Sequence, residues 1–110
     1  MEEIAFQVQG SAPEPYVVRF KRNCMNLSAR CTCPAGVVGQ YCKHRIRILE
    51  GNDEGVVSGN QTEVATIASW LSGTDVELVF KQLREAEHRF EEAKGEVSTL
   101  KKKFAKALQD

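Results

Sequence analysis

The stretch ARCTCPAGVVGQYCKHRIRIL, residues 29–49, holds most of the sulfur and imidazole chemistry of this 110-residue chain. It contains three of the four cysteines and one of the two histidines. Two pairs, each with one residue between its members, are separated by eight residues: Cys31, Cys33, Cys42 and His44. This concentration of metal-ligand side chains decides how the first half of the chain is expected to fold.

The spacing of the two pairs predicts a tetrahedral metal site. Side chains alternate along a strand, so Cys31 and Cys33 point to the same face. Cys42 and His44 converge if Cys42 lies at or before the first turn of a helix, because residues two apart inside a helix point to nearly opposite sides. Pro34 and the glycines between the pairs fit the tight reversal that joins them. Three thiolates and one imidazole match a closed Zn²⁺ site, with one structural zinc per chain.

Disulfides or chance burial explain the cysteines less well. Four cysteines allow three pairings into two disulfides, but the acidic start of the chain has no long apolar run and does not predict a secretory signal. A chance group of buried cysteines leaves the histidine unexplained. Cys24, in a predicted turn, is expected to be a free thiol rather than a ligand or a crosslink. The expected location is a reducing intracellular compartment, cytoplasmic or nuclear.

The residues before the cluster predict antiparallel strands. Apolar and polar residues alternate over residues 4–9 and again over residues 16–21. GSAPEP, residues 10–15, separates these runs, and NCMN, residues 23–26, predicts a second turn. The prediction is a hairpin or three-stranded meander whose inner face ends at the two thiols and carries Tyr16, Val18, Phe20, Leu27, Ala29, Cys31 and Cys33.

Residues 16–49 form a basic island in a chain whose net charge is zero. They contain no Asp or Glu, and they contain seven basic residues: Arg19, Lys21, Arg22, Arg30, Lys43, Arg45 and Arg47. Strand alternation places three of them on the outer face of the sheet: Arg19, Lys21 and Arg30. Two more share one side of the following helix: Lys43 and Arg47. These five are the candidate nucleic-acid-binding residues. The basic residues beside Cys42 would also favour thiolates over thiols.

The rest of the chain predicts helices. A Gly-rich linker, residues 51–60, follows the zinc-binding module, residues 1–50, and precedes a helical region, residues 61–110. NQTE, residues 60–63, places a capping Asn three residues before a Glu, and a short amphipathic helix follows. A second capping pattern, TDVE at residues 74–77, begins a long helix. The predicted fold class is therefore α+β, with a small zinc-stabilised meander and helix, a short helix and a long C-terminal helix.

The long helix carries the heptad pattern of a coiled coil. When heptads are counted from Val76, every a and d position is apolar. The a positions are Val76, Leu83, Phe90, Val97 and Phe104, and the d positions are Val79, Ala86, Ala93, Leu100 and Ala107. The members other than the alanines are the candidate oligomerisation residues.

The length of this helix favours a partner over folding back. A helix from residue 75 to the end of the sequence would span ~54 Å at about 1.5 Å per residue. A module of about 50 residues has a diameter of roughly 25 Å, so about half of the apolar stripe would stay uncovered. A homo-oligomer or a helical protein partner is therefore expected. The orientation stays open, because a parallel pair would join Glu96 to Lys101 favourably but would place Arg89 against Lys94.

The run C-x-C-x8-C-x-H, preceded by YVVRF and followed by RIRIL, resembles a SWIM-type zinc finger. The resemblance covers about residues 16–50. It implies a short β-hairpin that bears the first pair and a helix that starts at the second, with these ligands: Cys31, Cys33, Cys42 and His44. SWIM modules occur in chromatin remodellers, transposase-related proteins and recombination mediators, so the resemblance implies a role in binding DNA or protein.

Two functions of different classes follow. In the first, the basic island contacts the DNA backbone and the long helix sets the spacing between two copies. In the second, zinc only stabilises a small fold and the helix binds a protein partner, with no nucleic-acid binding. The resemblance and the local positive charge favour DNA binding over the protein-adaptor function. An enzyme with a small-molecule substrate is not expected, because all four zinc positions are filled by protein ligands, and no apolar run is long enough to predict a membrane span.

Overall fold

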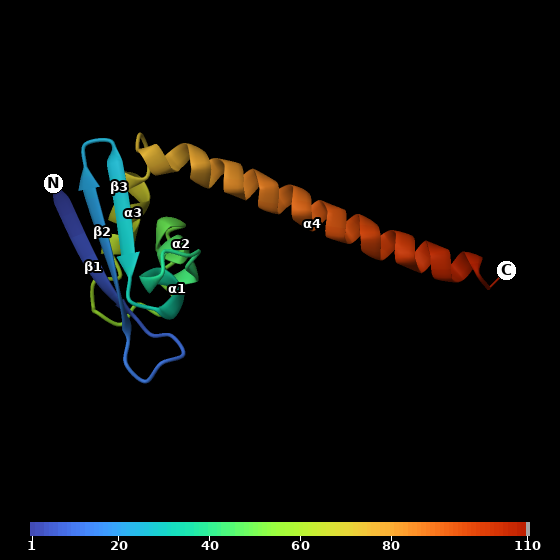
Figure 1. Ribbon diagram of the computed structural model, residues 1–110, viewed down its shortest axis with the longest axis horizontal. Helices are drawn as coiled ribbons and strands as arrows, with labels where there is room; N and C mark the ends of the chain where they lie inside the picture. Colours follow the sequence, from blue (N-terminus) through green and yellow to red (C-terminus); the bar gives the residue numbers. More distant parts are fainter. Residues whose placement is uncertain (110) are drawn as a thin grey trace. The chain divides into compact units, whose positions relative to one another are not determined.

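The computed structural model describes residues 1–109 and divides the chain into two compact units, Met1–Glu77 and a second that begins at Leu78. The elements, in chain order, are β1 (Glu2–Val8), β2 (Tyr16–Asn23), β3 (Asn26–Cys31), α1 (Pro34–Val37), α2 (Lys43–Leu49), α3 (Glu63–Trp70) and α4 (Asp75–Ala107). Figure 1 shows the three strands side by side, with α1 and α2 next to β3. The predicted α+β class is confirmed.

The sheet is an antiparallel meander in the order β1-β2-β3. Val18, in the central strand, pairs with Phe6 on one side and with Cys31 on the other. These three side chains therefore lie on one face, and all three are buried. The alternation of apolar and polar residues in the sequence produces this face, because every second side chain of a strand points the same way. The predicted meander, with its inner face ending at the first thiol pair, is confirmed.

The turn between β2 and β3 contains only Cys24 and Met25. Cys24 has a φ of 57°, in the left-handed region that few residues other than glycine adopt. Two-residue hairpin turns require this conformation, because it matches the twist of the two strands. Cys24 is exposed, away from the buried cysteines.

Segments after α2 complete the hydrophobic core of the first unit. Val56, Val64, Ile67 and Trp70 are buried together with the inner face of the sheet and with Ile48 of α2. The backbone of residues 55–57 also lies along the edge of β1. Val8 and Val56 form a β-bridge there, and two hydrogen bonds of 2.8 Å flank it, from Val57 N to Gln7 O and from Gln9 N to Gly55 O. Residues 51–77 therefore belong to the same compact unit as Cys31, Cys33, Cys42 and His44.

Asn60 has a different role from the predicted helix cap. Its side-chain amide donates to the carbonyl of Ala5 at 2.9 Å, and its oxygen accepts a hydrogen bond from Ser58. The residue that precedes α3 is Thr62, which makes no side-chain capping bond. The side chain of Asn60 thus connects the linker to the outer edge of β1, next to the backbone bonds that residues 55–57 make with that edge.

α4 begins beside the turn between β2 and β3. The carboxylate of Asp75 accepts a hydrogen bond from Leu27 N at 3.0 Å, and the N–H of Asp75 donates to Met25 O at 2.8 Å. From there α4 continues for 33 residues, and none of its described residues is buried. Within residues 1–109, no helix combines the length and the apolar character that crossing a membrane requires.

Candidate metal centre

Cys31 and Cys33 reach the site from the end of β3. Cys31 is the last residue of the strand, and Cys33 is the residue that caps the N-terminus of α1. Both side chains are buried. Backbone amides point at their sulfurs: Cys33 N–H donates to Cys31 Sγ at 3.5 Å and Gly36 N–H donates to Cys33 Sγ at 3.3 Å. The bond from Cys33 N–H acts to lower the pKa of the Cys31 thiol, although burial outweighs it.

Cys42 and His44 reach the site from the start of α2. Cys42 is the N-cap and has an extended backbone, with φ −134° and ψ 117°. His44 follows in the first turn of the helix, and both side chains are buried. The change from extended to helical backbone between them turns both ligand atoms to one side, as the sequence predicts for a Cys at the helix entrance.

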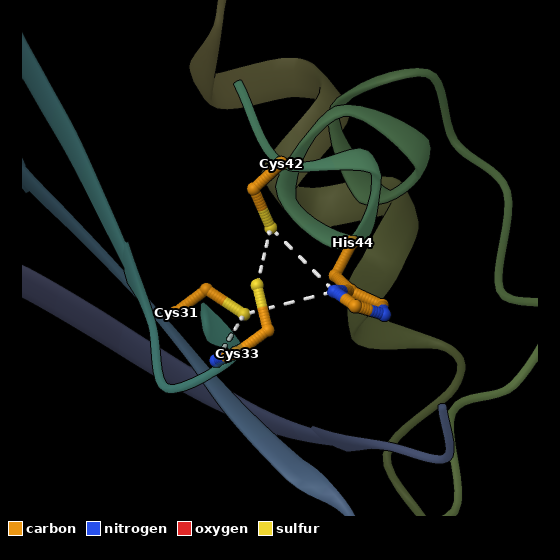
Figure 2. A group of neighbouring side chains, drawn as sticks. All are labelled: Cys31, Cys33, Cys42 and His44. Atoms are coloured by element: carbon orange, nitrogen blue, oxygen red, sulfur yellow. Dashed lines mark hydrogen bonds between the residues drawn. The ribbon is translucent and has the colours of Figure 1, made fainter. Parts of the chain in front are cut away.

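The four ligand atoms form a compact group, as Figure 2 shows. The Sγ atoms of Cys31, Cys33 and Cys42 and the Nδ1 atom of His44 all lie within 4.8 Å of one another. The separations are 3.3 Å for Cys33 Sγ to Cys42 Sγ, 3.5 Å for Cys42 Sγ to His44 Nδ1 and 3.9 Å for Cys31 Sγ to His44 Nδ1.

These separations fit a single zinc ion. Zn–S bonds of about 2.3 Å and Zn–N bonds of about 2.0–2.1 Å at tetrahedral angles place ligand atoms roughly 3.5–3.8 Å apart. The three separations given above, 3.3–3.9 Å, bracket that range, and no two of the four atoms are more than 4.8 Å apart. The four residues can therefore hold one metal ion, and a Cys₃His donor set indicates Zn²⁺. With four protein ligands the site is closed, which is typical of structural zinc.

The protonation of the thiols also favours a bound cation. Burial raises the pKa of the Cys31 thiol to about 12. Burial acts in the same direction on Cys42, but hydrogen bonds from the Arg45 backbone N–H and from the Cys33 and His44 side chains outweigh it and lower the pKa of Cys42 to about 6. Within this group of thiols, burial therefore opposes the loss of all the protons together. A divalent cation provides the positive charge that stabilises further thiolates and displaces the proton of Cys31.

Three neighbours of the site were missed by reasoning from the sequence. The ring of Tyr16 packs on the imidazole of His44, with 5.1 Å between ring centroids. The Arg45 guanidinium donates to the carbonyls of Ala29 and Gln40, so it joins β3 to the loop before α2. Gly36 lies so close to β3 that a Cβ atom there would be 2.5 Å from Cys31 O. Tyr16 gave a signal through its place on the inner face of the predicted sheet and Gly36 through the run CPAG, whereas the sequence did not indicate the bridging hydrogen bonds of Arg45.

The candidate nucleic-acid-binding residues lie on two separate surfaces. Arg19, Lys21 and Arg30 are exposed and share the outer face of the sheet, since Arg19 pairs directly with Arg30 in the register. Lys43 and Arg47 are exposed on α2, whose buried residues Ile48 and Leu49 pack in the core on the inner side of the sheet. The structure therefore brings the first three together but not all five.

The outer face of the sheet also carries an acidic group. Glu3 of β1 lies opposite Lys21 in the register, and its carboxylate accepts a hydrogen bond from the Arg19 guanidinium at 3.0 Å. Both side chains are substantially exposed, so water weakens this ion pair. Glu3 precedes the basic island in the sequence, and only the pairing of β1 with β2 places it there.

The candidate oligomerisation residues all lie on α4, and most of them are exposed. Val79, Phe90, Val97, Leu100 and Phe104 have exposed fractions between 51% and 67%. Val76 and Leu83 are half-buried. A polar helix surface normally carries few such side chains. The a and d positions of α4 form an apolar seam that is exposed at Val79 and from Ala86 onwards.

Comparisons with known proteins add no relative to this description: no family model, no curated protein and no solved structure matches the chain. The metal centre is therefore assigned from its donor set and geometry.

Loss of two ligands should abolish zinc binding. We expect the unmodified protein, purified without chelator, to contain one zinc per chain, and the Cys33→Ser, Cys42→Ser variant to contain almost none, because two ligands cannot close a tetrahedral site. Elemental analysis measures this. Cys24→Ser, which changes an exposed thiol outside the cluster, is the matched control and should keep its zinc. Full zinc content in the double variant would disprove the assignment.

Gly36 should be required for the metal site although it supplies no ligand. A methyl group at residue 36 would lie 2.5 Å from Cys31 O and 2.8 Å from Cys31 Cβ, so Gly36→Ala must displace the strand end that holds the first ligand. We expect zinc affinity to fall by about 10–100-fold, as for other changes in groups that support metal ligands. Competition with a zinc indicator measures it.

Gly95→Ala is the matched control for this substitution. A Cβ at Gly95 meets no atom within 4 Å beyond its own helical surroundings among the described residues. The same chemical change should therefore leave zinc affinity intact and stabilise α4 by up to about 1 kcal/mol. Equal zinc affinities for Gly36→Ala and the unmodified protein would contradict the proposed support of Cys31.

Proposed function

We propose that this chain is a zinc-stabilised protein-interaction module, with a SWIM-type finger in its first unit and a self-associating coiled-coil helix in α4. The observation that carries the proposal is the exposed apolar seam of α4. Its two phenylalanines, Phe90 and Phe104, are 62% and 67% exposed. Burying a Val, Leu or Phe side chain contributes about 1.5–3 kcal/mol, so a seam of this length strongly favours association.

The stability of α4 itself supports a partner. Most helices in proteins are stabilised by packing one apolar face rather than by the propensities of their residues. None of the described residues of α4 is buried, and Val76 and Leu83 are only half-buried, so its own chain covers little of the apolar face. A second helix that covers the a and d positions supplies it.

Zinc has a structural role in this proposal. The arrangement of a strand before the first ligand pair and a helix after the second, with C-x-C-x8-C-x-H spacing, supports assignment to the SWIM type. Four protein ligands leave no open position for a substrate, so we infer that the module is not an enzyme.

The charge of the first unit favours a protein partner over DNA. Asp and Glu outnumber Lys and Arg by nine to seven over residues 1–77. The basic island, residues 16–49, is thus part of a unit that is slightly acidic as a whole. Electrostatic binding to a polyanion normally requires a basic surface.

A charge in the apolar seam should separate the copies. We expect the unmodified protein to sediment as an oligomer at about 50 µM, a concentration above the dissociation constants of most specific interfaces. Leu100→Asp should sediment as a monomer, because association would bury a carboxylate without a partner. Thr99→Asp, one residue away at an outer heptad position, is the control and should remain an oligomer. A monomeric unmodified protein would contradict the proposed self-association.

Binding to DNA is a second candidate, supported by one specific observation. Arg19 and Arg30 are directly opposed across β2 and β3, with Lys21 on the same face. Like charges opposite each other destabilise a sheet, and a bound phosphate would remove this repulsion. The Glu3 carboxylate beside Arg19 opposes such binding.

Titration with duplex DNA at several salt concentrations tests this candidate. Each phosphate contact should contribute about −0.9 to the slope of log affinity against log salt, so three contacts give roughly −3. Replacing Arg19, Lys21 and Arg30 with Ala should weaken binding to all sequences alike, because phosphate contacts do not read bases. Glu3→Gln should strengthen binding by freeing Arg19. Absence of binding at low salt, or no effect of these variants, would leave the interaction module as the function.

A further inference from the structure

Resting on the self-association proposed above, we propose that α4 pairs with α4 of a second copy of this chain in the antiparallel orientation. In the register in which the two helices overlap most, Val76 of one copy faces Ala107 of the other. The residue numbers of every facing pair of a and d positions then add up to 183. Side-chain size, the shape of the helix surface and the charges beside the seam each support this orientation.

Side-chain sizes match in the antiparallel pair. There, each a position faces a d position of the second copy, so Phe90 faces Ala93, Val97 faces Ala86 and Val76 faces Ala107. In a parallel pair, like faces like, which places Phe90 against Phe90 and Ala93 against Ala93. Two large side chains that face each other crowd the core, and two alanines that face each other leave a void. Large side chains that face small ones fill the space evenly.

The surface of α4 has a hollow where the antiparallel pair needs one. This hollow is lined by Phe90, Ala93, Lys94, Val97, Ser98 and Lys101. Ala93 lies at its centre in the heptad pattern, since Phe90 and Val97 are the a positions on either side. Phe90 of the second copy, itself 62% exposed, would enter this hollow, and the symmetry of the pair repeats the contact once more.

The charges beside the seam are complementary only in the antiparallel pair. Antiparallel helices bring e positions near e positions and g positions near g positions, so Glu87 meets Lys94 and Arg89 meets Glu96, each contact occurring twice. All four contacts are attractive. In a parallel pair, where g meets e, Glu96 attracts Lys101 but Arg89 repels Lys94.

The charge of the whole helix agrees with these contacts. Residues 75–92 carry six acidic and three basic side chains, whereas residues 93–107 carry one acidic and five basic side chains. An antiparallel pair places the acidic half of one helix along the basic half of the other. A parallel pair places like halves together, and also aligns the two helix dipoles unfavourably.

Antiparallel pairing fixes how far apart the two zinc-binding units are attached. A helix of 33 residues is ~50 Å long at about 1.5 Å per residue. Each unit is joined to the N-terminus of its helix, and antiparallel N-termini lie at opposite ends of the pair. The assembly would therefore present two copies of the unit to partners about 50 Å apart, rather than side by side.

Disulfide trapping distinguishes the two orientations. In a Cys24→Ser background with zinc bound, Val79→Cys and Phe104→Cys are oxidised separately and as an equal mixture. The antiparallel pair places Val79 opposite Phe104, so only the mixture should give a covalent dimer on a non-reducing gel. The parallel pair places each residue opposite its own copy, so covalent dimers from the separate variants, with none added by mixing, would overturn the proposal.

Charge exchange provides a second test that leaves the seam unchanged. Glu87→Lys alone and Lys94→Glu alone should each weaken dimerisation by about tenfold, since two attractive contacts per dimer become repulsive. Mixing the two variants should restore the dimer, because each chain then meets the opposite charge. Contacts within each helix, such as the Lys94–Glu91 ion pair that Lys94→Glu removes, are the same in a variant alone and in the mixture. A gain on mixing therefore reports contacts between the two helices. A parallel pair predicts the reverse for Lys94→Glu, which would relieve its contact with Arg89 and strengthen the dimer.

The outcomes separate the two proposals. A dimer with the parallel pattern in both tests would overturn the antiparallel orientation and leave self-association intact. A monomeric unmodified protein at about 50 µM would overturn self-association itself, and the orientation with it.

Discussion

The convergence of three thiols and one imidazole is the constraint on which the first unit depends. These groups hold the end of β3, the start of α1 and the start of α2 within one cluster less than 5 Å across. Three cysteine sulfurs this close are stable as thiolates only around a cation, because burial raises the pKa of Cys31 to about 12 in its absence. A metal ion bound there would therefore hold the strand and the two helices in place. Gly36, Tyr16 and Arg45 fit closely around it, and each depends on the same arrangement.

The two units rely on different sources of stability. The first buries a small core around Phe6, Val18, Phe20 and Ile67 and adds a metal site. Structural zinc contributes about 10–16 kcal/mol of apparent binding free energy in small finger peptides, comparable to the entire stability of a typical domain. The second unit is one helix without a buried residue among those described. A bound zinc ion would complete the first unit, and the second helix proposed above would complete the other.

Reasoning from the sequence predicted the features that depend on local periodicity. Alternation predicted the meander, and the spacing of Cys42 and His44 predicted a helix that begins between them. It could not show which segments meet in space. Residues 51–60 read as a Gly-rich linker, yet Val56 is buried and Asn60 bonds Ala5, because the open edge of β1 needed polar partners. Glu3 likewise lies beside Arg19 only through strand pairing. The basic island is a property of residues 16–49 alone, whereas the unit to which it belongs carries nine acidic and seven basic residues.

The most direct test of this account is to remove zinc and follow the backbone amides by NMR. After chelation, we expect the dispersed signals of residues 1–77 to collapse towards values for an unfolded chain, because the metal's contribution exceeds what so small a core can replace. Helical signals from α4 should persist, since none of its described residues is buried, and adding zinc should restore the original spectrum. An unchanged, dispersed spectrum for residues 1–77 after complete metal removal would contradict the claim that the metal holds the fold.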